Sequence, residues 1–207
     1  MERYAIIIKT DGVCVLLHCY PGDCLSLEEL QKIMDTYPQM NICVALATSF
    51  GCPFEGIPPI QKVVDFTKRV YDMGIRSICL ADTIGIADPR QVRDTIHAVT
   101  EVMPDCEFQI HIHDTRGMGQ ANTLAAIECG IKTVQSTLGG LGGCPFAPGA
   151  SGNTATEDLV YMLQRMGYDT GIDFENLLAA AKYQKSFIDG IYSGHQQNIN
   201  TKTPPCC

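Results

Sequence analysis

Two histidines separated by a single residue are the side chains of this chain best suited to bind a metal ion. His111 and His113 fall in an expected strand over 107–113, where alternate side chains point to the same side. Asp82 follows the preceding expected strand, and Asn153 follows the next one. An amide oxygen beside two imidazoles suits Mg²⁺ or Mn²⁺ better than a structural zinc. The spacing predicts a divalent-cation site, the alternative being two hydrogen-bonded histidines near a strand end.

A glycine-rich segment presents the second candidate, a thiol. Residues 138–153 read LGGLGGCPFAPGASGN, with Cys144 at the centre. Glycine-rich loops cost backbone entropy to order, and they commonly serve as mobile lids. We therefore predict Cys144 to be a catalytic acid or nucleophile on a substrate loop that includes Gly142 and Gly143. Cys52 leaves two alternatives open, lining the same site or packing beneath a loop.

Composition limits the class of protein. The chain has 207 residues, 45% hydrophobic and 18% charged, which excludes a disordered chain and allows a substantial core. The net charge of -8 offers no electrostatic case for binding nucleic acid or an anionic membrane. No apolar run approaches the roughly 18 residues of a membrane helix. Eleven cysteines without a secretory leader indicate a reduced, cytoplasmic protein.

Strand-like and helix-like segments alternate along the chain. The expected strands cover 13–17, 41–48, 76–81, 107–113 and 132–137, each followed by a helical pattern. Such alternation is typical of a parallel βαβ architecture. The candidate residues fall at or just after strand ends, where (β/α) barrels place their active sites. An open doubly wound sheet is disfavoured because its G-x-G-x-x-G fingerprint is missing.

Three helices have recognisable start signals. Ser26 and Glu29 form a capping box, and Asp88 is an expected N-cap followed by Pro89 at the first helical position. The segment 154–157, with sequence TATE, is expected to cap another helix in the same way as Ser26. These signals locate the helices that must support the strand ends.

Four segments together resemble 3-hydroxy-3-methylglutaryl-CoA lyase, a family of the TIM-barrel metallolyase superfamily. They are GCPFEG at 51–56, ADTIG at 81–85, HIHDT at 111–115 and GGLGGCPFAPGASGNTATEDLV at 139–160. The similarity runs from about Cys24 to about Leu178. The His-x-His pair is shared across the superfamily, whereas the Gly-Gly-Cys-Pro loop is the part specific to the lyases.

The resemblance implies a role for each candidate residue. His111, His113 and Asn153 resemble the metal ligands, Cys144 the catalytic loop cysteine and Asp82 an active-site aspartate. The implied reaction is a retro-Claisen cleavage of an acyl-CoA substrate to acetyl-CoA and acetoacetate, assisted by Mg²⁺ or Mn²⁺. His111 is the best candidate for the base that takes the hydroxyl proton, and Cys144 would protonate the acetyl-CoA enolate.

The chain departs from the family pattern at its beginning. The Arg-Asp-Gly motif of the family's first strand is missing, and a full (β/α)₈ barrel needs about 250 residues. We expect a partial barrel of five βα units, corresponding to strands 4–8, in an N-terminally truncated family member. The expected organisation is an atypical segment at 1–23, the barrel part at 24–192 and a flexible tail at 193–207. Metal affinity should be weak because one anionic ligand is absent.

Two other functions remain open. The same chemistry could act on a related 3-hydroxy-acyl-CoA, as a lyase or an aldolase. Alternatively, the chain is a non-catalytic remnant that pairs with a second copy or a complementing chain, because an open barrel exposes sheet edges that invite pairing.

Overall fold

The computed structural model describes residues 13–18, 26–142 and 152–199, with only the backbone described for 13–18. The described strands form one parallel sheet in the order β1-β2-β3-β4-β5. They are β1 (Val13–His18), β2 (Ile42–Ala47), β3 (Ser77–Asp82), β4 (Glu107–Ile112) and β5 (Thr133–Gln135). Each strand pairs with its neighbour in sequence, as in a (β/α) barrel. The predicted α/β partial barrel is confirmed.

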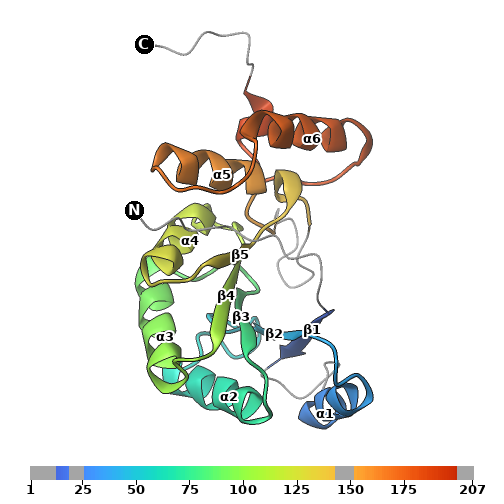
Figure 1. Ribbon diagram of the computed structural model, residues 1–207. Coiled ribbons are helices and arrows are strands. Elements are labelled where there is room, and N and C mark those ends of the chain that lie inside the picture. The colour runs from blue at the N-terminus through green and yellow to red at the C-terminus, as the bar shows by residue number, and fades with distance from the viewer. Residues whose placement is uncertain (1–12, 19–25, 143–151, 200–207) are drawn as a thin grey trace.

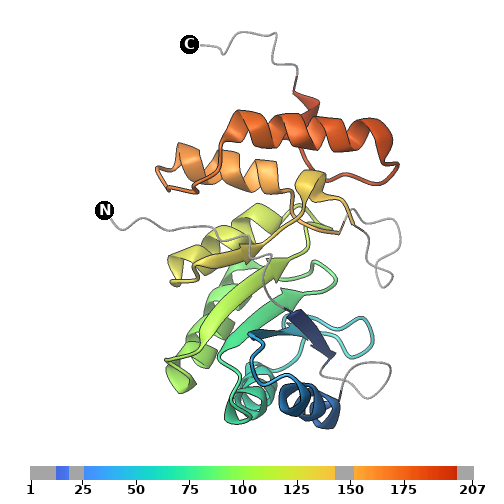
Figure 2. The ribbon, with the colours of Figure 1, turned by 45° about the vertical axis from the view of Figure 1, so that its right-hand side comes forward.

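In the described part of the chain, four helices connect the strands and two more follow the sheet. They are α1 (Leu27–Thr36), α2 (Ile60–Asp72), α3 (Pro89–Val102), α4 (Gly119–Glu128), α5 (Thr156–Arg165) and α6 (Phe174–Phe187). Figures 1 and 2 show α2, α3 and α4 side by side along one face of the sheet, with α5 and α6 across one end. The described residues also form two short 3₁₀ helices, η1 (Leu138–Gly140) and η2 (Gln196–Asn198), and both contact α5 and α6. None of the described helices is long and apolar enough to cross a membrane.

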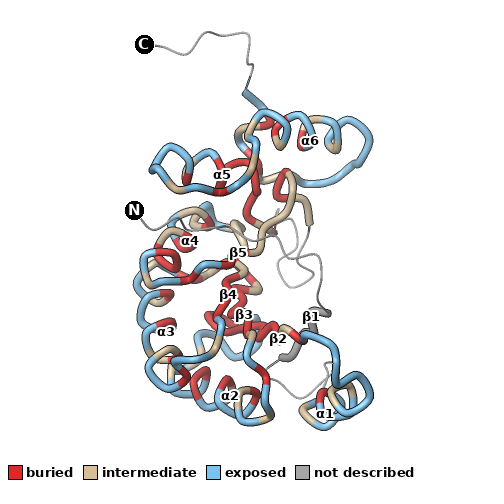
Figure 3. The backbone as a smooth tube through the Cα atoms, viewed as in Figure 1, coloured by how far each residue is buried: buried red, intermediate tan, exposed pale blue. Residues whose placement is uncertain are grey.

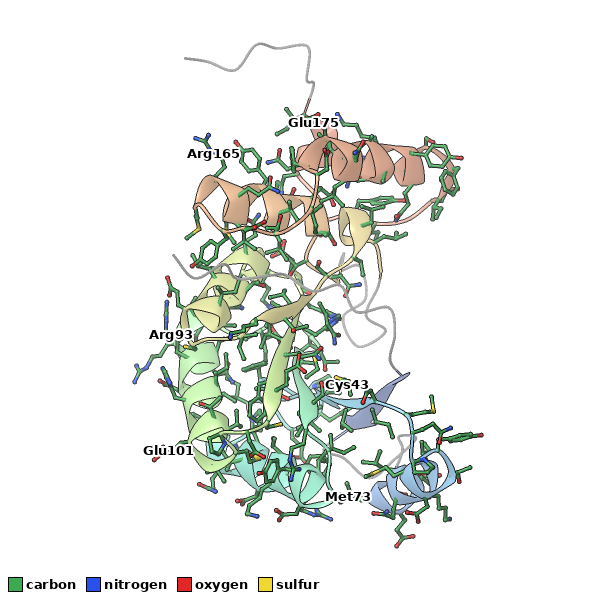
Figure 4. The ribbon with its side chains drawn as sticks, in the orientation of Figure 1. Cys43, Met73, Arg93, Glu101, Arg165 and Glu175 are labelled. Atoms are coloured by element: carbon green, nitrogen blue, oxygen red, sulfur yellow. The ribbon has the colours of Figure 1, made fainter. Side chains whose placement is uncertain are left out.

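The hydrophobic core lies between the sheet and the helices. Alternate strand residues face the helices and are fully buried: Val44, Leu46, Ile78, Leu80, Ile110 and Ile112. Figure 3 shows this burial along β2, β3 and β4, while Arg93 and Glu101 of α3 point away from the sheet in Figure 4. Because strand side chains alternate, the residues between the core positions must face the other way.

The other face of the sheet, which we call the inner face, carries a row of polar side chains near the amino ends of the strands. Gln109 donates to Ser77 Oγ at 2.9 Å, and Gln135 donates to Gln109 Oε1 at 3.1 Å, so hydrogen bonds cross three strands. A cavity of about 650 Å³ lies on this face, lined by the first residues of β3 and β4 and by the end of α1. This cavity is at the amino ends of the strands, the end opposite to the two histidines.

Two of the three predicted helix starts are confirmed. At α1 the Ser26 N–H donates to Glu29 Oε2 at 2.7 Å, and the Glu29 N–H donates to Ser26 Oγ at 3.2 Å. At α3 the carboxylate of Asp88 accepts from the N–H groups of Arg90 and Gln91. Both signals depend only on residues within one turn, which is why the sequence predicts them.

The third predicted start, at 154–157, is confirmed only in position, because the helix begins there but the predicted side-chain cap was wrong. Helix α5 begins at Thr156 and has no side-chain cap. The Thr154 hydroxyl donates instead to the carbonyl of Ile112 at 2.9 Å, and the Glu157 carboxylate accepts from the Gly139 N–H at 2.9 Å. Both side chains therefore stabilise contacts with distant segments rather than the start of their own helix.

The prediction of a flexible tail from residue 193 was wrong for residues 193–199. Residues 193–199 are described and include η2. The N–H groups of His195 and Gln196 both donate to the buried carboxylate of Asp158 at 2.8 Å, and the Gly194 N–H donates to the carbonyl of Gly139 at 3.1 Å. This part of the tail is thus bound to α5 and η1, and residues 200–207 lie outside the described part.

Candidate functional site

The two histidines lie together at the carboxyl end of β4. His111 is in the strand and His113 follows it directly, and their ring centroids are 5.1 Å apart with the planes at 66°. Both side chains are half-buried. Within the described residues, the buried Nδ1 atom of each ring has no hydrogen-bond partner. The prediction that strand alternation brings these rings to one side is confirmed.

Burial favours the neutral form of both imidazoles. Burial, together with the neighbouring ring of His113, lowers the pKa of His111 from its usual 6.5 to about 4. Burial also lowers the pKa of His113, and a hydrogen bond with the Thr83 backbone partly opposes this effect. A neutral imidazole has a lone pair available for a metal ion, so the environment prepares both rings for this use.

Asn153 is brought to the histidines by a short backbone bridge rather than by the main sheet. Residues His113 and Asn153 pair as an isolated antiparallel bridge, next to which the Asp114 N–H donates to the Gly152 carbonyl at 2.6 Å. The amide nitrogen of Asn153 donates to the Leu141 carbonyl at 3.2 Å. With its nitrogen used in this way, the side chain offers its oxygen as the remaining polar atom.

The chemistry of these donors fits a divalent cation. Two neutral imidazoles combined with an amide oxygen suit a borderline ion such as Mn²⁺ and are compatible with Mg²⁺, which prefers oxygen. The buried Nδ1 atoms of His111 and His113 have no hydrogen-bond partner among the described residues, which is unusual for buried polar atoms and consistent with a site for an ion. Across residues 26–142 and 152–199, however, no three His, Cys, Asp or Glu side chains gather in an arrangement that could hold a metal ion. The candidate ligands His111, His113 and Asn153 therefore have no anionic side chain among the described residues to complete them.

The structure separates Asp82 from the two histidines. His111 lies opposite Ala81 in the sheet register, whereas Asp82 lies opposite the core residue Ile112 and shares its side of the sheet. The fully buried Asp82 carboxylate accepts from the N–H groups of Ile86 and Ala87 at 3.1 and 3.0 Å. Burial raises the pKa of Asp82, and these backbone N–H groups oppose the rise. The hydrogen bonds of Asp82 stabilise the turn after β3. A direct role of Asp82 in the reaction stays a prediction.

Replacing Asp82 with alanine should lower the free energy of unfolding by about 2–4 kcal/mol, because two buried N–H groups lose their acceptor. Asp82→Asn keeps one acceptor oxygen and should cost about half as much. Urea denaturation of the metal-free chain measures both effects. Asp94→Ala is the control, since this α3 carboxylate is exposed and should change stability by less than about 0.5 kcal/mol. Equal stabilities of the Asp82 and Asp94 variants would show that the turn does not depend on Asp82.

Cys52 packs within its own loop, and a role in lining the candidate site stays a prediction. It is buried, pairs with Gly56 in an isolated antiparallel bridge and accepts from the Phe54 N–H at its sulfur, 3.4 Å away. Its side chain also lines a small cavity of about 60 Å³ together with Thr48 and Pro59. These contacts are those of a residue packed beneath a loop.

The predicted substrate loop is only partly described. Cys144 and Gly143 lie outside the described residues. Gly142 has a φ of 136°, and a Cβ atom at this position would lie 2.3 Å from the Asn153 amide nitrogen. Glycine is therefore required at Gly142 both by the backbone conformation and by the close approach of Asn153.

Sequence reasoning missed two residues whose side chains hydrogen-bond to the backbone of the glycine-rich segment and of Asn153. Glu157 accepts from the Gly139 N–H, and the Ser193 hydroxyl donates to the backbone carbonyl of Asn153 at 2.8 Å. These partners are 18 and 40 residues apart in the sequence. No local pattern marks such contacts, because serine and glutamate are common on exposed surfaces.

Comparisons with known proteins show that the chain is similar to hydroxymethylglutaryl-CoA lyases. A family model described as HMGL-like matches residues 26–183. The hydroxymethylglutaryl-CoA lyase YngG of Bacillus subtilis is 42% identical over 160 residues, covering 76% of this chain and 54% of that protein. The mitochondrial hydroxymethylglutaryl-CoA lyase of Homo sapiens is also 42% identical over 160 residues, covering 76% of this chain and 49% of that protein. The chain thus spans about half the length of these curated relatives.

A solved structure agrees with this similarity. An HMG-CoA lyase from Acinetobacter baumannii, in complex with coenzyme A and 3-methylmalate, superposes with a TM-score of 0.85 at 33% identity. The match covers 95% of this chain and 68% of that one. The agreement extends over nearly the whole length of this chain, so it includes the sheet and the helices across its end.

Proposed function

The chain belongs to the HMGL-like family, and we propose that it catalyses the cleavage of 3-hydroxy-3-methylglutaryl-CoA to acetyl-CoA and acetoacetate. The observation that carries this proposal is the pairing of two neutral histidines with Asn153 at the carboxyl end of β4. The names of the relatives support the reaction class, and the coenzyme A bound to one of them supports a CoA thioester as the substrate.

His111, His113 and Asn153 would hold Mg²⁺ or Mn²⁺. When bound, such a cation supplies positive charge that favours ionisation of the tertiary hydroxyl and orients the anionic substrate. This local charge matters because the chain itself carries a net charge of -8 and does not attract anions as a whole.

The chain's own residues would move two protons. Burial favours the unprotonated form of His111, so this ring is the proposed acceptor of the hydroxyl proton, and its lone pair would have to leave the cation to take that proton. The carbon–carbon bond then breaks as the ketone of acetoacetate forms, and its electron pair passes to the α-carbon of acetyl-CoA. The Cys144 thiol would donate a proton to that carbon. The Cys144 thiolate regains its proton from the medium, and His111 releases its own, so the chain returns to its starting state.

A second candidate function is to act only in an assembly with a second polypeptide, and the inner face of the sheet favours it. This face opens into the cavity of about 650 Å³, at the end of the strands away from the histidines. A second polypeptide packed over the inner face would bury its polar side chains, and the chain would then act only in that assembly.

A related 3-hydroxy-acyl-CoA remains the alternative substrate. The eleven cysteines support a reducing compartment such as the cytoplasm.

Release of acetoacetate from 3-hydroxy-3-methylglutaryl-CoA by the purified chain tests the proposal. We expect release in the presence of Mn²⁺ or Mg²⁺, its loss on addition of EDTA and its return when excess Mn²⁺ is restored. Circular dichroism of the same sample controls for folding. A folded chain that binds Mn²⁺ but releases no acetoacetate would contradict the proposed activity and favour the assembly with a second polypeptide.

A further inference from the structure

Ser193 contacts the candidate metal site from the last described segment of the chain. Its hydroxyl donates to the backbone carbonyl of Asn153 at 2.8 Å. The fit around this hydrogen bond is close, because a Cβ atom at Gly140 would lie 1.8 Å from the Ser193 hydroxyl and 2.9 Å from the Asn153 carbonyl. Serine is thus held against Asn153 in a space that only a glycine at position 140 leaves open.

The two residues that follow Ser193 anchor it. The next residue, Gly194, donates its N–H to the Gly139 carbonyl at 3.1 Å. The buried carboxylate of Asp158 accepts from the N–H and from the Nδ1 atom of His195, both at 2.8 Å. The Ser193 hydroxyl therefore belongs to a segment that is bound to α5 and η1. This attachment fixes the position of the hydroxyl relative to Asn153.

The Ser193 contact restrains a different part of Asn153 than the other contacts do. The amide nitrogen of Asn153 is bound to Leu141, and its backbone pairs with His113 in the short bridge. The backbone carbonyl is a further group, and its peptide plane is held on the opposite edge by the Thr154 N–H, which donates to the Ile112 carbonyl at 3.3 Å. The Ser193 hydroxyl holds the carbonyl edge of the same plane and so opposes its rotation relative to the histidines.

We propose that Ser193 is a positioning residue, which fixes Asn153 so that its amide oxygen can serve as a ligand together with His111 and His113. The inference rests on the proposed function, since it treats Asn153 as a metal ligand. Groups that orient a ligand typically change metal affinity by about 10–100-fold when they are removed. Ser193 needs no contact with the ion to have such an effect.

Mn²⁺ affinity of the whole chain, measured by the electron paramagnetic resonance of the unbound ion, tests the proposal. Ser193→Ala should weaken Mn²⁺ binding by about tenfold while the melting temperature stays within about 2 °C. Ser193→Thr keeps the hydroxyl and should restore most of the affinity. Ser186→Ala is the matched control, because this α6 hydroxyl makes the same kind of bond, to the Tyr183 carbonyl at 2.7 Å, away from the site. Unchanged affinity in Ser193→Ala would overturn the proposal.

Amide hydrogen exchange of the metal-free chain gives a second, independent readout. The N–H of Asp114 donates to Gly152 and that of Thr154 donates to Ile112, so both report on the backbone around Asn153. We expect exchange at these two amides to become about tenfold faster in Ser193→Ala and to stay unchanged in Ser186→Ala. Unchanged exchange would overturn the proposal even if the wild-type chain bound no Mn²⁺, a result that would separately refute the proposed function. Faster exchange with unaltered Mn²⁺ affinity would also overturn it, since Ser193 would then hold only the backbone.

Discussion

Replacing Cys144 with alanine is expected to lower the rate of acetoacetate release by about 10²–10⁴-fold, the usual contribution of a positioned acid. The reason is chemical. Cleavage leaves a carbanion equivalent on acetyl-CoA that must gain a proton, and alanine has none to give. Mn²⁺ binding should stay within about twofold of wild type, because the proposed ligands are His111, His113 and Asn153. The rate and the Mn²⁺ titration are measured on the same preparation.

The other cysteines provide the control for this prediction. Cys129, at the end of α4, is only partly buried, and its sulfur lies 3.6 Å from the ring of His97, a residue of α3. Cys129→Ala should leave both the rate and the Mn²⁺ affinity unchanged. If Cys144→Ala lost Mn²⁺ binding, the cysteine would be a ligand or a structural residue. If it kept the wild-type rate, the proton would have to come from another group.

His113→Ala should weaken Mn²⁺ binding by more than about 100-fold, since removal of a direct ligand costs more than removal of a group that orients one. The neutral ring of His113 is paired with that of His111 at 5.1 Å, and its buried Nδ1 atom has no other partner among the described residues. The ring also has a hydrogen bond with the Thr83 backbone, so its loss should lower the free energy of unfolding by about 1–2 kcal/mol. Titration with Mn²⁺ and urea denaturation separate the two effects.

His97→Ala is the matched control for the loss of a histidine. His97 is exposed on α3, on the helical side of the sheet, and is expected to leave Mn²⁺ affinity unchanged. An unaltered Mn²⁺ titration of His113→Ala would refute the assignment of this ring as a ligand. Equal losses in the two variants would mean that Mn²⁺ binds histidines without specificity.

The sequence by itself determined the elements and the histidine pair. Alternation along residues 107–113 predicted that His111 and His113 face the same side, and the ring distance confirms it. The capping box of Ser26 and the N-cap at Asp88 were likewise predictable. These features depend on residues one to four positions apart, whose relative placement is set by the geometry of a strand or a helical turn.

Only the tertiary structure decided which side chains surround that pair. The register of β3 against β4 placed Asp82 on the core side of the sheet. Thr154 and Glu157 do not cap α5 because their side chains hydrogen-bond to Ile112 and Gly139 instead. The contact of Ser193 with Asn153 spans 40 residues and lies in a segment that the sequence suggested was free. A hydrogen-bonding side chain has many possible partners, and the partner that it finds depends on how the whole chain packs. Local patterns carry no information on that choice.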